Sequence, residues 1–186
     1  YENTLVIFTS DNGPTHVKQV DIEFFNSAGI FVNSKKTVKG SVNEGGLRVP
    51  TIATWPSKIK AGSISDHPSV FYDFFATMAD IVDSPLPYPT DGISYLPTLI
   101  GEKQIKHDYL YWEFPEKQYR GQQAIRKDNW KGVKKNLLKG KSKLQLFNLE
   151  DDPKEMNDLA KNYPEIVDKL ENLMKKAHTK AALEKF

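Results

Sequence analysis

The sequence has 186 residues, of which 39% are hydrophobic and 11% aromatic, so it can form a hydrophobic core of its own. Its net charge of +2 gives no indication of the concentrated basic surface that is typical of nucleic-acid-binding proteins. No apolar run has the length of a transmembrane helix. The absence of cysteine excludes disulfides, thiolate zinc sites and a cysteine nucleophile within these residues, but leaves the cellular compartment open.

An uninterrupted apolar run, Leu5 to Phe8, predicts a β-strand that is buried on both faces of a sheet. It ends at Ser-Asp-Asn-Gly-Pro, residues 10–14, each of which favours turns or caps. Such a strand would bring the side-chain oxygens of Asp11 and Asn12 to the carboxyl edge of the sheet, where open α/β folds place their sites. These oxygens suit Ca²⁺ or Mg²⁺. Taken by themselves, the same residues are explained more simply as an ordinary turn.

The chain begins at Tyr1, and its first predicted strand follows almost at once. Because a buried strand needs neighbours on both sides, we expect these residues to be the C-terminal piece of a longer protein.

The middle of the chain predicts a loop, a short strand and a helix. Residues 31–42 are polar and basic, and the double glycine that follows at Gly45-Gly46 permits positive φ or close backbone approach. Residues 51–55 predict a second short strand. Apolar residues recur at helical spacing over 70–82, with Ser69 as the expected N-cap. Residues 91–101 are expected to form a connector.

From residue 108 onward the pattern changes to short strands. Four runs predict strands at 109–114, 122–125, 130–133 and 144–149, separated by turn-forming residues. Sequential short strands favour a small antiparallel sheet. Residues 164–177 predict a helix that starts with Pro164 and carries one apolar stripe. We therefore expect an α+β appendage in which one helix covers the sheet.

Three segments in the same order resemble the sulfatase family. Residues 9–14, TSDNGP, resemble the metal-binding strand end of sulfatases. Residues 39–50, KGSVNEGGLRVP, are similar to their Lys-Gly-x-x-x-Glu-Gly-Gly-x-Arg-x-Pro segment. Residues 146–159, LFNLEDDPKEMNDL, are similar to their Leu-Tyr-Asp-Leu-x-x-Asp-Pro-x-Glu-x-x-Asn-Leu pattern. The two longer segments are specific, and together the three resemble the arylsulfatase and N-acetylgalactosamine-6-sulfatase type.

The resemblance implies an α/β fold, namely the C-terminal part of an alkaline-phosphatase-like sulfatase fold. Residues 1–104 would belong to its catalytic domain, and residues 105–186 would form a subdomain of about four antiparallel strands packed on a C-terminal helix. By family analogy the full-length protein would be periplasmic or secreted. Its partners would be a sulfated small molecule or glycan and the remainder of its own N-terminal catalytic domain, with no nucleic acid and no membrane span.

The resemblance also carries over to individual site residues. Asp11 and Asn12 match two ligands of a Ca²⁺ site, which Mg²⁺ could also occupy, and Lys39 matches a lysine that contacts the sulfate and the metal-site region. A cation and a lysine can neutralise the charged oxygens of a sulfate ester and orient them for attack. A solvated loop lysine is the competing interpretation, but the position next to the glutamate and double glycine favours a functional one. Arg48 is expected to brace this loop through Glu44 rather than to touch substrate.

Further residues are open to two interpretations. His16 could contact a sugar hydroxyl or the bridging oxygen, or could simply be a surface histidine. Trp112, Glu113 and Tyr119 could line a substrate cleft, but it is equally possible that Trp112 packs in the appendage core and that Tyr119 lies in a loop.

The sequence departs from the family in one decisive respect. Sulfatases use a formylglycine made from Cys or Ser in a Cys/Ser-x-Pro/Ala-x-Arg motif, together with two further Asp ligands, and none of these is present. We expect them to precede Tyr1, so that the chain by itself should be inactive. A related metal-dependent phosphodiesterase or phosphonate-monoester hydrolase is an alternative, as is a non-catalytic carbohydrate-binding module. A sulfated carbohydrate is the default substrate by analogy with relatives.

Overall fold

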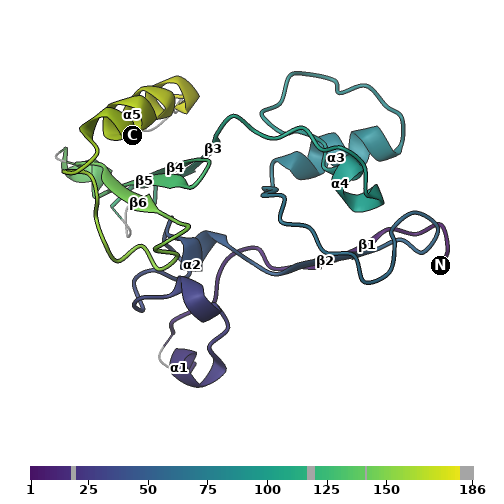
Figure 1. The fold of residues 1–186 in the computed structure, drawn as a ribbon, viewed down its shortest axis with the longest axis horizontal. Coiled ribbons are helices and arrows are strands. Elements are labelled where there is room, and N and C mark those ends of the chain that lie inside the picture. The colour runs from purple at the N-terminus through teal and green to yellow at the C-terminus, as the bar shows by residue number, and fades with distance from the viewer. Residues whose placement is uncertain (18–19, 117–119, 141, 181–186) are drawn as a thin grey trace. The chain divides into compact units, whose positions relative to one another are not determined.

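The computed structural model describes residues 1–17, 20–116, 120–140 and 142–180. In chain order the elements are β1 (Val6–Thr9), α1 (Ile22–Phe25), η1 (Gly29–Phe31), α2 (Glu44–Leu47), β2 (Thr51–Thr54), α3 (Asp73–Ile81), α4 (Leu96–Ile100), β3 (Leu110–Phe114), β4 (Gln122–Lys127), β5 (Trp130–Lys135), η3 (Leu137–Lys139), β6 (Gln145–Asn148) and α5 (Pro164–Ala177) (Figure 1).

The chain forms two compact units. One comprises Tyr1–Thr9 with Pro50–Asp108, and the other comprises Ser10–Val49 with Tyr109–Phe186. Each unit is therefore built from segments that are far apart in the sequence. The predicted domain boundary between residues 104 and 105 stays a prediction.

In the first unit, β1 and β2 form a two-stranded antiparallel ribbon. The register runs from Val6 opposite Thr54 to Thr9 opposite Thr51. Phe8 is 69% exposed and Ile52 is 65% exposed. The strand is therefore exposed in this chain, because a two-stranded ribbon does not supply the layers that would cover it, and its burial within a larger sheet stays a prediction.

Helix α3 begins at Asp73, so the predicted N-cap at Ser69 is wrong. The Asp73 side chain is fully buried, and its Oδ2 accepts the Val70 N–H over 2.9 Å at the start of the helix. Its Oδ1 accepts the Ile93 N–H at 2.9 Å and lies 2.7 Å from His107 Nε2. Asp73 thus joins three segments of the unit, and His107 has a structural partner.

The aromatic stripe that predicted helix α3 is not the face that this unit buries. Phe71 is 58% exposed and Phe74 is 46% exposed, whereas the small and polar residues Ala76 and Thr77 are buried. Thr77 Oγ1 accepts the Tyr95 N–H over 3.0 Å. That bond anchors the entry into α4, a helix in the segment that the sequence predicted only as a connector.

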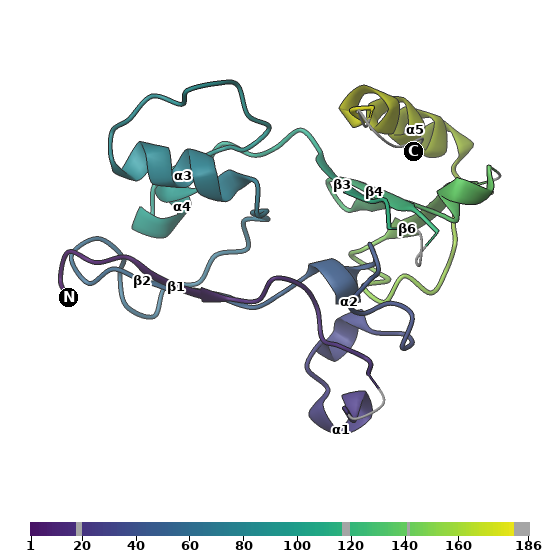
Figure 2. The same ribbon diagram turned by 180° about the vertical axis from the view of Figure 1, so that it is seen from behind.

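In the second unit, four strands form an antiparallel sheet in the order β3-β4-β5-β6. Helix α5 covers one face of the sheet, and the segment that carries α2 lies at the opposite face (Figures 1 and 2). Adjacent residues of one strand point to opposite faces, so Ile125 packs under α5 whereas Ala124 packs against Val42. The four predicted strands and the predicted C-terminal helix are confirmed.

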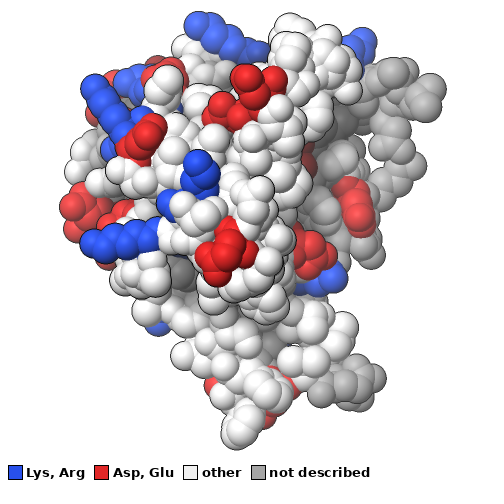
Figure 3. Space-filling view, turned by 90° about the vertical axis from the view of Figure 1, so that its right-hand side faces the viewer, with Lys and Arg blue, Asp and Glu red and all other residues white. Residues whose placement is uncertain are grey.

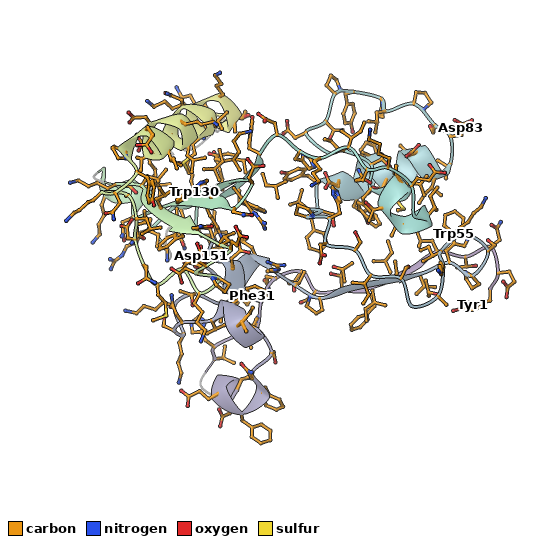
Figure 4. All side chains as sticks on the ribbon, in the orientation of Figure 1. Tyr1, Phe31, Trp55, Asp83, Trp130 and Asp151 are labelled. Atoms are coloured by element: carbon orange, nitrogen blue, oxygen red, sulfur yellow. The ribbon has the colours of Figure 1, made fainter. Side chains whose placement is uncertain are left out.

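The core of the second unit consists of two clusters, one on each face of its sheet. Beneath α5 lie Ile125, Leu144, Leu146, Leu170 and Met174, and on the opposite face lie Val42, Ala124, Val133 and Phe147. Figure 4 labels Trp130, which packs against the α5 cluster and lies 5.0 Å from Tyr163, ring centroid to ring centroid.

The surface carries charges of both signs. On the face drawn in Figure 3, Lys and Arg side chains are interspersed with Asp and Glu among a majority of uncharged residues. Among the described residues, none of the helices has the length and apolar character needed to cross a membrane.

Candidate functional site

Two of the sequence segments that carry the family resemblance lie side by side in the second unit. The Gly13 N–H donates to the Gly46 carbonyl over 2.9 Å, and the Lys39 N–H donates to the Pro14 carbonyl over 3.1 Å. The turn that follows the Asp-Asn pair is therefore bound to the Lys39–Leu47 segment at two points. These bonds hold the backbone that directly follows Asn12 against the backbone of Lys39 and Gly46.

Glycine is required where these two segments meet. A Cβ atom on Gly13 would lie 1.8 Å from the Gly45 carbonyl oxygen, and one on Gly46 would lie 2.2 Å from the Ser41 carbonyl oxygen. Gly45 and Gly46 form part of helix α2. Of the two roles predicted for the double glycine, close backbone approach is the one that the structure uses.

The predicted metal ligands have side-chain oxygens suited to a hard cation. Asp11 is exposed, and its Oδ1 accepts the Asn12 N–H over 3.0 Å. A carboxylate offers roughly four lone-pair sites, so this bond leaves Asp11 the capacity to bind a cation. Asn12 is half-buried, and its Nδ2 donates to the Gly13 carbonyl over 3.2 Å, which leaves the amide oxygen for coordination. Calcium binding at this pair stays a prediction.

Lys39 and His16 are both exposed in the same unit. The backbone of Lys39 is held at Pro14, and His16 follows Pro14 by two residues. Within the described residues, no group of three or more His, Cys, Asp or Glu side chains is placed to hold a metal ion. A contact of either side chain with substrate stays a prediction.

A buried cluster of charged residues lies behind this segment. Lys131 is fully buried, and its Nζ lies 2.6 Å from Glu44 Oε1 and 3.1 Å from Glu155 Oε1. The Glu44 N–H, in the first turn of α2, donates to Glu155 Oε2 over 2.7 Å. Burial would raise the pKa of Glu44, but the ammonium of Lys131, together with Arg126 and Arg48, outweighs it and holds that pKa below its ordinary value.

Arg48, whose side chain is half-exposed, pairs with Glu44, as predicted from the sequence. Its Nη1 lies 3.6 Å from Glu44 Oε2, and its guanidinium lies 4.5 Å from the centroid of the Phe31 ring. Figure 4 labels Phe31, the last residue of η1. Arg48 therefore braces the loop through Glu44, and the predicted brace is confirmed.

Two further side chains of the sheet bind the segment between Lys39 and Glu44. Gln122, from β4, donates to the Gly40 carbonyl over 2.9 Å. Lys135, from β5, donates to Asn43 Oδ1, and burial lowers the pKa of its ammonium. The sheet thus binds this segment at Gly40, Asn43 and Glu44.

Trp112 and Glu113, two of the three residues that could line a cleft, have partners within the second unit. Trp112 is partly buried against the cluster that contains Val42. Glu113 Oε1 accepts the Tyr111 hydroxyl and lies 2.5 Å from His178 Nδ1. Burial raises the pKa of the Tyr111 hydroxyl, and Glu113 raises it further. Tyr119 lies outside the described residues.

The sequence interpretation missed Lys131 and Lys135 and did not connect Glu44 with Glu155. One signal was available: Lys131 and Val133 alternate along a predicted strand and so share a face. A lysine on the apolar face of a strand needs an anionic partner. The sequence did not reveal that this partner is divided between two distant segments.

Comparison with known proteins identifies relatives over most of the chain. Residues 38–180 match the family model described as N-sulphoglucosamine sulphohydrolase, C-terminal. The chain is 30% identical to N-acetylgalactosamine-6-O-sulfatase of Bacteroides thetaiotaomicron over 96% of this chain and 37% of that protein. It is 34% identical to human arylsulfatase A over 70% of this chain and 24% of that protein.

The fold is similar to that of solved structures. The crystal structure of Ps i-CgsB in complex with k-i-k-neocarrahexaose gives a TM-score of 0.76 at 30% identity, over 95% of this chain and 37% of that chain. The chain therefore spans well under half the length of these relatives, between 24% and 37%. The family match and the shared fold lead to one conclusion: the chain belongs to the sulfatases and corresponds to the C-terminal portion of their alkaline-phosphatase-like fold.

Proposed function

We propose that the protein containing this chain is a sulfuric ester hydrolase that removes sulfate from a carbohydrate, and that this chain supplies part of its active site. The observation that carries the proposal is the pair of backbone bonds that join Gly13 to Gly46 and Pro14 to Lys39. They support the proposal because they join the turn that follows the Asp-Asn pair to the segment that carries the lysine. The relatives named N-acetylgalactosamine-6-O-sulfatase and Ps i-CgsB, the latter solved with k-i-k-neocarrahexaose, support a sulfated glycan as the substrate class.

Asp11 and Asn12 would hold a Ca²⁺ ion, with Mg²⁺ as the alternative. The exposed carboxylate and the amide oxygen fit a hard cation, which prefers oxygen ligands. Such an ion, when bound, would neutralise negative charge on the sulfate group and orient it. Two side-chain oxygens fill only part of a Ca²⁺ coordination sphere of roughly 6–8 ligands, so further ligands would come from other parts of the enzyme or from water.

Lys39 would bind the sulfate group directly. Its exposed side chain extends from a segment whose backbone is bound at Pro14 and at Gly40, so the starting point of the side chain is fixed. A cation held near the sulfate group would stabilise the charge that develops on the sulfate oxygens and the leaving group as the S–O bond breaks. His16 would contact a hydroxyl or the bridging oxygen of the sugar.

The nucleophile would come from residues other than these 186. In this family it is a formylglycine, and the printed sequence contains neither cysteine nor a matching serine motif. The role of this chain is therefore to bind and orient the sulfate group rather than to attack it. By analogy with the bacterial relatives, we also propose a periplasmic or secreted location.

The test is sulfate release by the full-length protein. Purified protein is incubated with sulfated oligosaccharides, a phosphate diester and a phosphonate monoester, and the released anions are separated by ion chromatography. We expect sulfate release that a Ca²⁺ chelator abolishes. Preferential cleavage of the phosphorus esters would instead favour the phosphodiesterase or phosphonate hydrolase alternative. Sugar binding without any cleavage would favour a non-catalytic module.

A further inference from the structure

Lys131 is an unusual residue for its position in the sheet. It lies on the same face of β5 as Val133, opposite Phe147 in the register, and its side chain is fully buried. Transfer of an ammonium group from water to such a site is unfavourable unless the charge is paired. The pairing is provided by Glu44 and Glu155, which come from different segments of the chain.

We propose that Lys131 is a positioning residue of the sulfatase site. By binding Glu44 it fixes the Lys39–Leu47 segment, so that Lys39 keeps its place beside the Asn12-Gly13-Pro14 turn. The inference rests on the proposed function, because it assigns Lys131 an effect that is exerted through Lys39.

The route from Lys131 to the site is short and consists of observed contacts. Lys131 Nζ binds Glu44 Oε1 at 2.6 Å, and Glu44 begins helix α2. Within α2, the Gly46 carbonyl accepts the Gly13 N–H. At the other end of the same segment, the Lys39 N–H donates to the Pro14 carbonyl. A displacement of Glu44 would therefore disturb both bonds that join the two segments.

Stability alone does not explain why a charged cluster occupies this position. Replacement of a buried ion pair by apolar residues of similar volume is often neutral or stabilising. A charge-assisted hydrogen bond is directional, however, and it defines where the carboxylate must lie. Misplacement of a catalytic group by about 1 Å can cost roughly 10²-fold in rate, so precise placement has a kinetic value that stability measurements do not report.

A double-mutant cycle in the full-length enzyme tests the proposal. Four proteins are compared: wild type, Lys131→Met, Lys39→Ala and the double variant. We expect Lys131→Met to lower kcat by about 10–10²-fold and Lys39→Ala to lower it by about 10²–10³-fold. If Lys131 acts through Lys39, the double variant should turn over within about threefold of Lys39→Ala, because the two losses are then not additive.

Three outcomes would overturn the inference, and they are distinguishable. Losses of kcat that multiply in the double variant would mean that Lys131 acts independently of Lys39. A normal kcat for Lys131→Met, with reduced melting temperature only, would make Lys131 a purely structural residue. Either result leaves the proposed function intact. Normal turnover by Lys39→Ala would overturn the proposed role of Lys39, and the inference with it.

Two further variants keep the test decisive. Lys131→Met leaves two buried carboxylates, so Lys131→Met/Glu155→Gln removes the same cation together with one negative charge and should fold more readily. The double-mutant cycle with Lys39→Ala is then repeated in the protein that carries Lys131→Met/Glu155→Gln. The matched control is Lys134→Met, since Lys134 is the next lysine along β5 and pairs with Glu171 at 2.7 Å in a partly exposed position. We expect its kcat to equal that of wild type.

Discussion

The Glu44 N–H donates to Glu155 Oε2 over 2.7 Å, although 111 residues separate the two in the sequence. Glu44 belongs to the Glu-Gly-Gly segment and Glu155 to the Asp-Pro-Lys-Glu segment. Lys131 binds both carboxylates from a third position. The two segments resemble the family separately in the sequence, but in the structure Glu44 and Glu155 belong to one buried cluster. This cluster lies next to the proposed sulfate-binding segment.

The first prediction concerns the pH dependence of stability. The folded pKa of Glu44 lies below its ordinary value, so its ionisation stabilises the folded state above the unfolded pKa, and this contribution is lost as the pH falls through the folded pKa. Removal of Lys131 takes away the largest influence that lowers this pKa and leaves burial opposed only by Arg126 and Arg48, so we expect the cost of burying the anion to grow as the pH rises. The charged groups around Glu44 are Lys131, Arg126, Arg48 and Glu155.

Lys131→Met should therefore lower the free energy of unfolding by about 3–5 kcal/mol at pH 8 and by clearly less at pH 5. Chemical denaturation of wild type and variant at both pH values measures the two differences. Lys134→Met serves as the control, because its ion pair is partly exposed and should contribute about 1 kcal/mol or less at either pH. An equal loss at pH 5 and pH 8 for Lys131→Met would contradict the assignment of Glu44 as the ionised partner.

The second prediction concerns Gly13. In Gly13→Ala the new Cβ would lie 1.8 Å from the Gly45 carbonyl oxygen, and neither backbone can move without breaking the bond from Gly13 to Gly46. We expect a loss of about 2–3 kcal/mol of unfolding free energy and reduced turnover. Gly140→Ala is the comparison, since a Cβ there meets nothing within 4 Å and only its positive φ of 70° adds a cost, of about 1–2 kcal/mol. Comparable melting curves and full activity for both variants would show that the two segments are not packed as described.

Periodicity and turn residues were sufficient to predict the second unit's sheet. The strands from β3 to β6 and helix α5 follow from alternation, turn-forming residues and one apolar stripe, which are local properties of the sequence. Burial was harder to predict where it depends on partners distant in sequence. The aromatic stripe of α3 and the apolar residues of β1 have the composition of core residues, yet Phe74 and Phe8 are exposed in this chain.

The residues of the candidate site could be predicted from local sequence, but the contacts between them could not. Asp11, Asn12 and Lys39 belong to short segments that resemble a family, so they could be named from the sequence. The contacts that hold them could not, because Gly13 to Gly46 and Lys131 to Glu155 are pairings that no local pattern specifies. Lys131 could be suspected only from its position on the apolar face of a strand.

The third prediction concerns the metal. In the full-length protein, Asp11→Ala should raise the Ca²⁺ concentration required for half-maximal turnover by roughly 10–100-fold, because loss of one oxygen ligand weakens the site. Glu23→Ala removes an exposed carboxylate from α1 in the same unit and should have no effect. Ca²⁺ titrations of activity after chelation provide the measurement. The same midpoint for wild type and Asp11→Ala would remove Asp11 from the ligand set.

The fourth prediction concerns local stability in the 186-residue chain. Amide hydrogens of Ile7 and Ala53 in the two-stranded ribbon should exchange faster than those of Ile125 and Val133, because the ribbon is largely exposed whereas the sheet is buried on both faces. Hydrogen exchange followed by mass spectrometry or NMR distinguishes the two regions. Slower exchange in the ribbon than in the sheet would contradict this order of stability.

The most direct test of the proposed sulfate-binding role is the turnover of Lys39→Ala in the full-length enzyme. Lys39 is exposed and its removal leaves no cavity, so the melting temperature should hardly change while kcat falls by about 10²–10³-fold. Lys39→Arg should restore little, because a planar guanidinium does not replace a compact ammonium in a confined site. Lys36→Ala, in the same loop, is the matched control and should have normal kcat. If Lys39→Ala and Lys36→Ala turn over a sulfate ester equally fast, Lys39 is a solvated loop lysine and the proposed site is wrong.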